Sequence, residues 1–225
     1  MAAVEYTVLQ KCAAEFWGTF GVVFCGTGAI IINDLYGGVI SHTGVAITFG
    51  VIVMTMIYSL QKISGAHMNP AVTIALWVNG NISRHSVLPY AIAQIAGALM
   101  ASAILRFLFP GSESLGATFP SGSILQSFVM ELILTFMLMW VILRIIDQDE
   151  LHSLAGGIIG GVVLLEAMFA GPVSGASMNP ARSIAPGCIS GHIEHLWIYV
   201  VATTLGAVLA VRVNNFWQIK RDSRV

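Results

Sequence analysis

A nine-residue segment that occurs twice constrains the fold of this 225-residue chain more than any other feature. Residues 64–72 and 174–182 lie 110 positions apart and match at seven of nine positions. The copies contain Asn69-Pro70-Ala71 and Asn179-Pro180-Ala181. Upstream of the copies, Glu15, Thr19 and Phe20 recur as Glu131, Thr135 and Phe136. Such an internal repeat predicts two similar structural units, about residues 9–108 and about 124–213, within a single domain of residues 1–225.

The composition indicates that both units lie in a membrane. Hydrophobic residues make up 56% of the chain and charged residues 9%, against about 45–50% and about 25% in soluble domains. Six runs are long and apolar enough to cross the hydrocarbon core as helices, which takes about 20 residues. They are Leu9–Ile32, Thr43–Leu60, Ser86–Leu108, Ile124–Ile146, Ser153–Ala170 and Leu196–Val213. The prediction is an all-α, multi-pass membrane protein.

Two shorter apolar segments, Met68–Val78 and Met178–Cys188, begin at the Asn-Pro pairs. Each runs for about ten residues, which is half a bilayer at about 1.5 Å per residue. Each unit therefore reads as three spans with a half-helix between the second and the third. Because an odd number of spans forces the second unit to insert upside down, the sequence predicts an inverted 3+3 repeat whose shared site lies near the membrane midplane.

Basic residues predict the orientation, because cytoplasmic connections carry an excess of Lys and Arg. The segments Asn33–His42 and Pro110–Gly122 contain neither residue. The basic residues concentrate at the alternate connections and the ends, at Lys11, Lys62, Arg84, Arg144, Lys220, Arg221 and Arg224. Both termini are therefore expected in the cytoplasm of a cell whose inner or plasma membrane holds the protein.

Several classes of protein are excluded. A net charge of -1 and a pI near 6.6 offer no basic surface for nucleic acid. Cys12, Cys25 and Cys188 lack the spacing of a disulfide framework or a zinc site. No combination of Ser, Cys and His predicts an enzyme, and neither a cofactor nor a metal is expected.

The doubled motif predicts a water-filled path. Non-helical backbone at membrane depth persists only where it is buried in protein or lines a wet cavity. Asn caps the first free N–H groups of a helix, and Pro at the next position has no N–H to leave unpaired. Two inverted half-helices would meet with their positive ends at the centre and repel cations and protons.

The amides of Asn69 and Asn179 are expected to donate hydrogen bonds to one passing oxygen and so interrupt a chain of water molecules. The residues ahead of each Asn are expected to be extended and to offer carbonyl acceptors along the path. They are Gly65, Ala66 and His67 in the first copy and Gly175 and Ser177 in the second.

On these motifs the chain resembles the aquaporin, or major intrinsic protein, family, from Ala14-Glu15-Phe16 to the last span. The resemblance implies a right-handed helical bundle that conducts water passively, in a homotetramer with one pore per subunit. It also implies that Glu15 and Glu131 anchor the two pore loops as hydrogen-bond acceptors.

The resemblance further implies an outer constriction, or selectivity filter, at Phe49, Ala167, Ala176 and Arg182. Water channels of the family usually have histidine where Ala167 stands. Glycerol facilitators usually have tryptophan at Phe49, an aromatic residue at Ala176 and aspartate at Ser183. The surroundings of the second motif look most like the nodulin-like branch and its bacterial relatives, which implies that water, glycerol, urea and metalloid hydroxides pass.

Some alternatives stay open at this point. The chain could be a glycerol or metalloid facilitator for which water is secondary, an ion-coupled transporter that uses its membrane carboxylates, or a scaffold. Glu166 could border the constriction or face a neighbouring helix or subunit. His67 is expected to pack beside the pore loop, and His152 to be a solvated loop residue or a pH-sensitive gate.

Overall fold

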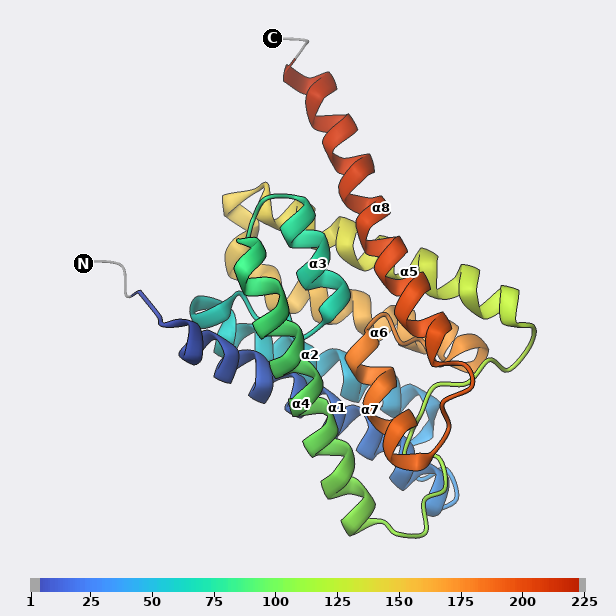
Figure 1. Ribbon diagram of the computed structural model, residues 1–225. Coiled ribbons are helices and arrows are strands. Elements are labelled where there is room, and N and C mark those ends of the chain that lie inside the picture. The colour runs from blue at the N-terminus through green and yellow to red at the C-terminus, as the bar shows by residue number, and fades with distance from the viewer. Residues whose placement is uncertain (1–4, 223–225) are drawn as a thin grey trace.

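The computed structural model describes residues 5–222, with side chains up to Trp217 (Figure 1). Its described part is helical throughout apart from the connections. The helices are α1 Val8–Leu35, α2 Ser41–Ser64, α3 Pro70–Val78, α4 Arg84–Leu108, α5 Ile124–Ile146, the 3-10 helix η1 Asp149–Leu154, α6 Ala155–Ser174, α7 Pro180–Ser190 and α8 Leu196–Asp222. Six of them are long and apolar enough to cross a membrane. The predicted spans and half-helices are therefore confirmed; Arg224 and the side chains of Lys220 and Arg221 lie outside the described residues.

Local sequence explains where these helices begin. Thr7 forms a capping box with Gln10, in which each side chain pairs with the other residue's backbone N–H. Ser83 and Ser123 cap α4 and α5 through their side chains. α3 and α7 each begin at the Pro of an Asn-Pro pair, with the Asn side chain as cap.

Small residues set the helix crossings, and they do so in the same way in both halves. α1 packs against α4, and α5 packs against α8. A methyl group at Gly97 would overlap the carbonyl oxygen of Phe16, and one at Gly206 would overlap that of Leu132. Glycine at these crossings lets the backbones approach to van der Waals distance, as membrane helices require.

The two halves meet along α2 and α6. At this crossing a Cβ on Gly50 would lie 2.6 Å from the carbonyl oxygen of Gly160, and a Cβ on Gly160 would lie 2.6 Å from that of Gly50. The contact is thus reciprocal between equivalent residues of the two repeats. The half-helices α3 and α7 each pack between α4 and α8 and also touch one another.

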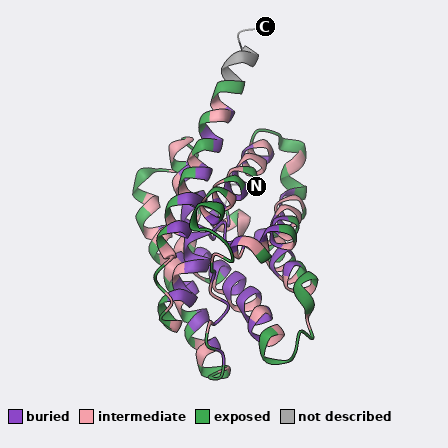
Figure 2. Ribbon diagram, turned by 90° about the vertical axis from the view of Figure 1, so that its right-hand side faces the viewer, coloured by how far each residue is buried: buried purple, intermediate pink, exposed green. Residues whose placement is uncertain are grey.

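The outer faces of the spanning helices are apolar, and the polar side chains turn inward. Buried residues gather on the inner sides of the helices in Figure 2. Large apolar side chains such as Val51 and Leu165 are exposed on the outside, whereas Glu15, Gln94 and Glu131 are fully buried. This distribution is inside-out relative to a soluble protein and fits a bundle surrounded by lipid.

Candidate functional site

The two loops that lead into α3 and α7 have nearly the same backbone conformation. Gly65 and Gly175 end α2 and α6 with φ of 91° and 85°. The alanine after each glycine has φ of 50° and 41°, and Met68 and Met178 have φ of 51° and 54°. The expected extended backbone is therefore wrong. Left-handed residues that alternate with others form a nest, in which successive N–H groups point at one anion.

The anion in the first nest is the carboxylate of Glu15, which is fully buried. Its Oε1 accepts hydrogen bonds from the backbone N–H of His67 at 2.9 Å and from the hydroxyl of Ser64 at 2.6 Å. Its Oε2 accepts one from the backbone N–H of Met68 at 2.7 Å. One side chain of α1 thus satisfies two loop N–H groups that would otherwise be buried without partners.

Glu131 of α5 occupies the second nest in the same way. It accepts hydrogen bonds from the backbone N–H of Ser177 and of Met178, both at 2.9 Å, and from the hydroxyl of Ser174 at 2.7 Å. It is also fully buried. The position of each loop is thus fixed by the first spanning helix of its own half.

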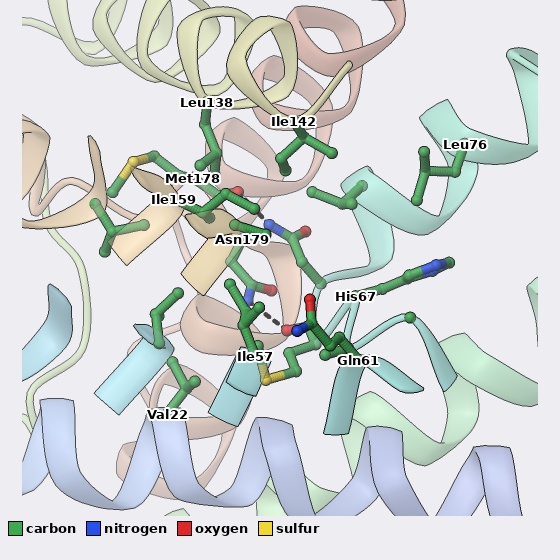
Figure 3. Close-up of a pocket in the computed structure, with 18 of the residues that line it drawn as sticks. Val22, Ile57, Gln61, His67, Leu76, Leu138, Ile142, Ile159, Met178 and Asn179 are labelled. Carbon is green, nitrogen blue, oxygen red and sulfur yellow. Dashed lines mark hydrogen bonds between the residues drawn. The ribbon is translucent and has the colours of Figure 1, made fainter. Parts of the chain in front are cut away.

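The loops are joined to each other through the two asparagines. Nδ2 of Asn69 donates to the carbonyl of Met178 at 2.7 Å, and Nδ2 of Asn179 donates to the carbonyl of Met68 at 2.8 Å. Figure 3 draws these bonds as dashed lines. Each Oδ1 accepts from the N–H two residues on, at 2.9 Å and 3.0 Å. Since an amide nitrogen carries two hydrogens, one on each Asn stays available to a molecule in the cavity.

Two cavities meet inside the bundle. The proximal cavity, on the side where α5 ends and η1 lies, has a volume of about 460 Å³ and reaches from Asn81 and His152 past the two asparagines to Arg182. The distal cavity, of about 440 Å³, opens among Asp34, Ser121 and other residues on the opposite side. Apolar side chains surround the asparagines in Figure 3, among them Val22, Ile57, Leu138, Ile142 and Ile159.

Among the described residues, four line both cavities: Phe49, Ala167, Ala176 and Arg182. These are the four filter positions that the family resemblance implies. They lie 20 residues before Asn69, and 12 residues before, three before and three after Asn179. α2 supplies Phe49, α6 supplies Ala167, the second loop supplies Ala176 and α7 supplies Arg182. The predicted filter residues therefore stand where one cavity passes into the other.

Arg182 is nearly fully buried, with 2% of its surface exposed. Its NH1 donates to the carbonyl of Gly116 at 2.8 Å, and its Cζ lies 5.0 Å from the centre of the Phe49 ring. The Nε N–H has no hydrogen-bond partner among the described residues. The guanidinium is thus held from two sides in a residue that lines both cavities.

The residues predicted to offer carbonyls all line a cavity. Gly65, Ala66, His67 and Ser177 line the proximal cavity, and Gly175 lines the distal one. Their role as acceptors for a passing molecule stays a prediction. The His67 side chain lies against the ring of Tyr90 at 5.2 Å, with Nδ1 3.1 Å from the hydroxyl of Thr73.

Glu166 and His152 have different surroundings. Glu166 is buried, lines neither cavity, and neither of its oxygens has a hydrogen-bond partner among the described residues. It therefore turns toward neighbouring helices of its own chain and not toward the constriction. His152 lies in η1 at the proximal mouth, with Nδ1 3.7 Å from a carboxylate oxygen of Asp149.

Sequence reasoning missed the side chains that support the loops from behind. In the first half, Gln94 of α4 donates to Glu15 at 2.7 Å and to the hydroxyl of Thr73 at 2.9 Å. A glutamine inside an apolar span is a signal that could have identified it. In the second half, Thr118 donates to Ser183 at 2.8 Å. Thr118 lies in a connection whose sequence gives no comparable signal.

Comparisons with known proteins agree with this geometry. The family model described as major intrinsic protein matches residues 2–213. The chain is 45% identical over 207 residues to aquaporin NIP1-1 of Zea mays, covering 91% of this chain and 73% of that protein. It is 40% identical over 214 residues to nodulin-26 of Glycine max, covering 94% and 79%.

A solved structure has the same fold. The aquaglyceroporin of Plasmodium falciparum superposes with a TM-score of 0.84 at 25% identity, over 92% of this chain and 95% of that one. The matched family, the six spanning helices, the paired loops and the cavities that meet at four residues all lead to one conclusion. The chain belongs to the major intrinsic protein family and is a multi-pass membrane channel, not an enzyme.

Proposed function

We propose that this channel conducts water passively, together with small uncharged solutes such as glycerol, urea and metalloid hydroxides, and excludes ions and protons. The observation that carries the proposal is a pair of cavities inside the bundle that lie against the same four residues, Phe49, Ala167, Ala176 and Arg182. Transport then needs no conformational cycle, because a neutral molecule can diffuse from one cavity into the other.

Ion exclusion follows from the centre of the bundle. α3 and α7 begin beside each other, so the positive ends of both helix dipoles face the same short stretch of the path. The free hydrogen on each amide, of Asn69 and of Asn179, donates to a water oxygen there. Because both lone pairs of its oxygen are then occupied, this water donates to its two neighbours along the path but accepts from neither, which interrupts proton hopping.

The permeant is selected at the four-residue constriction. Arg182 offers a positive charge and the N–H groups that are not bonded to Gly116, and Phe49 offers an aromatic face. The other two sides are methyl groups, of Ala167 and Ala176. Such an opening suits a small neutral molecule that has hydroxyl or amide groups on one side, and the charge repels cations.

The ion-coupled alternative is less well supported. A proton relay needs carboxylates along the path, but Glu15 and Glu131 accept hydrogen bonds from the loops, and Glu166 lines neither cavity. We propose that both chain ends are cytoplasmic, in accord with the Lys and Arg distribution, and that the channel is a homotetramer. The distal cavity then opens outside the cell.

Osmotic shock of proteoliposomes in a stopped-flow instrument tests the function. We expect fast shrinkage in sucrose, followed by re-swelling in glycerol, urea or arsenite, without current under an applied voltage. A flux that depends on an ion gradient would show coupled transport and contradict the proposal. Water flux equal to that of protein-free liposomes would leave a scaffold as the function.

A further inference from the structure

The orientation of Arg182 depends on a segment that belongs to neither repeat. The acceptor of its guanidinium, the carbonyl of Gly116, lies in the connection between α4 and α5, residues 109–123. Apart from this bond and the Phe49 ring, the guanidinium has no described side-chain hydrogen-bond partner. Whatever holds Gly116 in place therefore also holds the arginine of the constriction.

The backbone around Gly116 needs support to keep its shape. Leu115 has φ of 51° and Gly116 has φ of 66°, so two successive residues are left-handed, which is costly for leucine. Leu115 is fully buried and packs with Ile31 and Leu105. A methyl group on Gly116 would lie 3.0 Å from the carbonyl oxygen of Thr27, so the segment is pressed against α1.

Arg106, in the last turn of α4, anchors the start of this segment. Its NH1 donates to the carbonyl of Ser112 at 2.7 Å. The hydroxyl of Ser112 accepts a hydrogen bond from the backbone N–H of Leu115 at 3.2 Å. Three short steps thus connect one arginine to the other: Arg106 to Ser112, Ser112 to Leu115, and the adjoining Gly116 to Arg182.

We propose that Arg106 is a positioning residue that determines the selectivity of the channel by fixing the Gly116 carbonyl and, through it, Arg182. The inference rests on the proposed function, because it assigns Arg106 to the same constriction. Without the Arg106 bond, the carbonyl of Ser112 loses its hydrogen bond to a side chain of α4. The Gly116 carbonyl then moves, Arg182 leaves its position over Phe49, and larger neutral solutes pass more easily.

An alternative is that Arg106 only stabilises the end of α4, since a basic residue in the last turn interacts favourably with the helix dipole. Permeability separates the two roles. We expect Arg106→Leu to raise the ratio of glycerol to water permeability severalfold in proteoliposomes. Arg106→Lys, which keeps one donor, should restore most of the original ratio. Arg84→Leu, at the exposed other end of α4, is the matched control and should not change it.

A double variant tests whether the effect passes through Arg182. In an Arg182→Val background, Arg106→Leu should leave the ratio of glycerol to water permeability unchanged, because the residue to be positioned is gone. An equal change in both backgrounds would overturn the proposal. So would a parallel fall of water and glycerol flux that follows the amount of folded protein, since this is the result of a purely structural role.

A readout without transport keeps the inference separate from the proposed function. In nanodiscs, the guanidinium nitrogen resonances of labelled arginine can be recorded, with Arg182 assigned by its loss in Arg182→Val. We expect the Arg182 signals to shift in Arg106→Leu and to keep their positions in Arg106→Lys and Arg84→Leu. Unmoved Arg182 signals in Arg106→Leu would overturn the inference whichever solutes the channel conducts.

Discussion

The two pore loops are close copies in backbone and anchoring, yet they are supported from different places. Behind the first loop stands Gln94 of α4, a residue inside the repeat, bonded to Glu15. Behind the second loop stands Thr118, from the connection between the repeats, bonded to Ser183. The same connection supplies Gly116 to Arg182. The repeated loops thus build the centre of the path, and the connection between the repeats supports the constriction by bonding Arg182 and Ser183.

This difference has a functional consequence. The asparagines form reciprocal bonds, so the centre treats both directions of approach alike. The constriction lies to one side of the centre, and the residue that matches Arg182 in the first copy is Val72. Exclusion of ions can therefore follow from the symmetric motif, whereas the choice of permeant depends on residues that the two halves do not share.

The largest effect should come from removing a carboxylate anchor. Glu15→Ala and Glu131→Ala each leave two buried loop N–H groups without partners, at about 1–3 kcal/mol per group. Both variants should lose most of their folded protein in membranes, measured by size-exclusion chromatography in detergent. Normal folding of one variant but not the other would show that Glu15 and Glu131 are not equivalent anchors, and normal folding of both would show that neither carboxylate is needed to hold its loop.

The glycine crossings should give the next largest effect, and an equal one in both halves. A methyl group in Gly97→Ala or Gly206→Ala overlaps a backbone carbonyl, so each should lower the free energy of unfolding by about 1–3 kcal/mol. The denaturation midpoint in detergent measures this. Gly161→Ala is the matched control, because no atom lies within 4 Å of the added methyl group.

A large difference between the losses of stability in Gly97→Ala and Gly206→Ala would show that the two helix crossings are not packed equally tightly. A loss of stability in Gly161→Ala as large as theirs would show that helix flexibility, and not the crossing, is responsible.

The smallest effects on stability are expected from Gln94 and Thr118, the side chains that support the two loops from behind, and they should differ between the two. Gln94→Leu removes a donor to a carboxylate, which is worth about 1.5–3 kcal/mol, and Thr118→Val removes a bond between hydroxyls, about 0.5–1.5 kcal/mol. We expect Gln94→Leu to lower the thermal midpoint more, and Thr118→Val to change glycerol permeability more. The reverse pattern would contradict the division between centre and constriction.

Sequence reasoning predicted most of the fold because the repeat and the apolar runs carry local signals. The Asn-Pro pairs mark the starts of α3 and α7 through capping chemistry that needs no tertiary context. The loops were predicted wrongly as extended. Their left-handed residues include Ala66 and Met68, and this backbone is held by the distant carboxylate of Glu15, which accepts from the N–H groups of His67 and Met68.

The constriction could be located by spacing, but its support could not. Gly116 is bonded to a residue 66 positions away in the sequence, and Arg106 is bonded to one six positions away. Nothing in the sequence around them indicates either partner. The unpaired oxygens of Glu166 are also a property of the packed structure alone. Hydrogen bonds between an irregular connection and distant residues produce no periodic pattern in the sequence from which they could be predicted.

The most direct test of the account is the ratio of glycerol to water permeability in Ala167→His, measured by stopped-flow in proteoliposomes. If the centre excludes ions and the constriction selects the solute, as we propose, the larger side chain should lower glycerol permeability much more than water permeability while no current appears. An equal loss of both, or an unchanged ratio, would show that the constriction does not select the permeant.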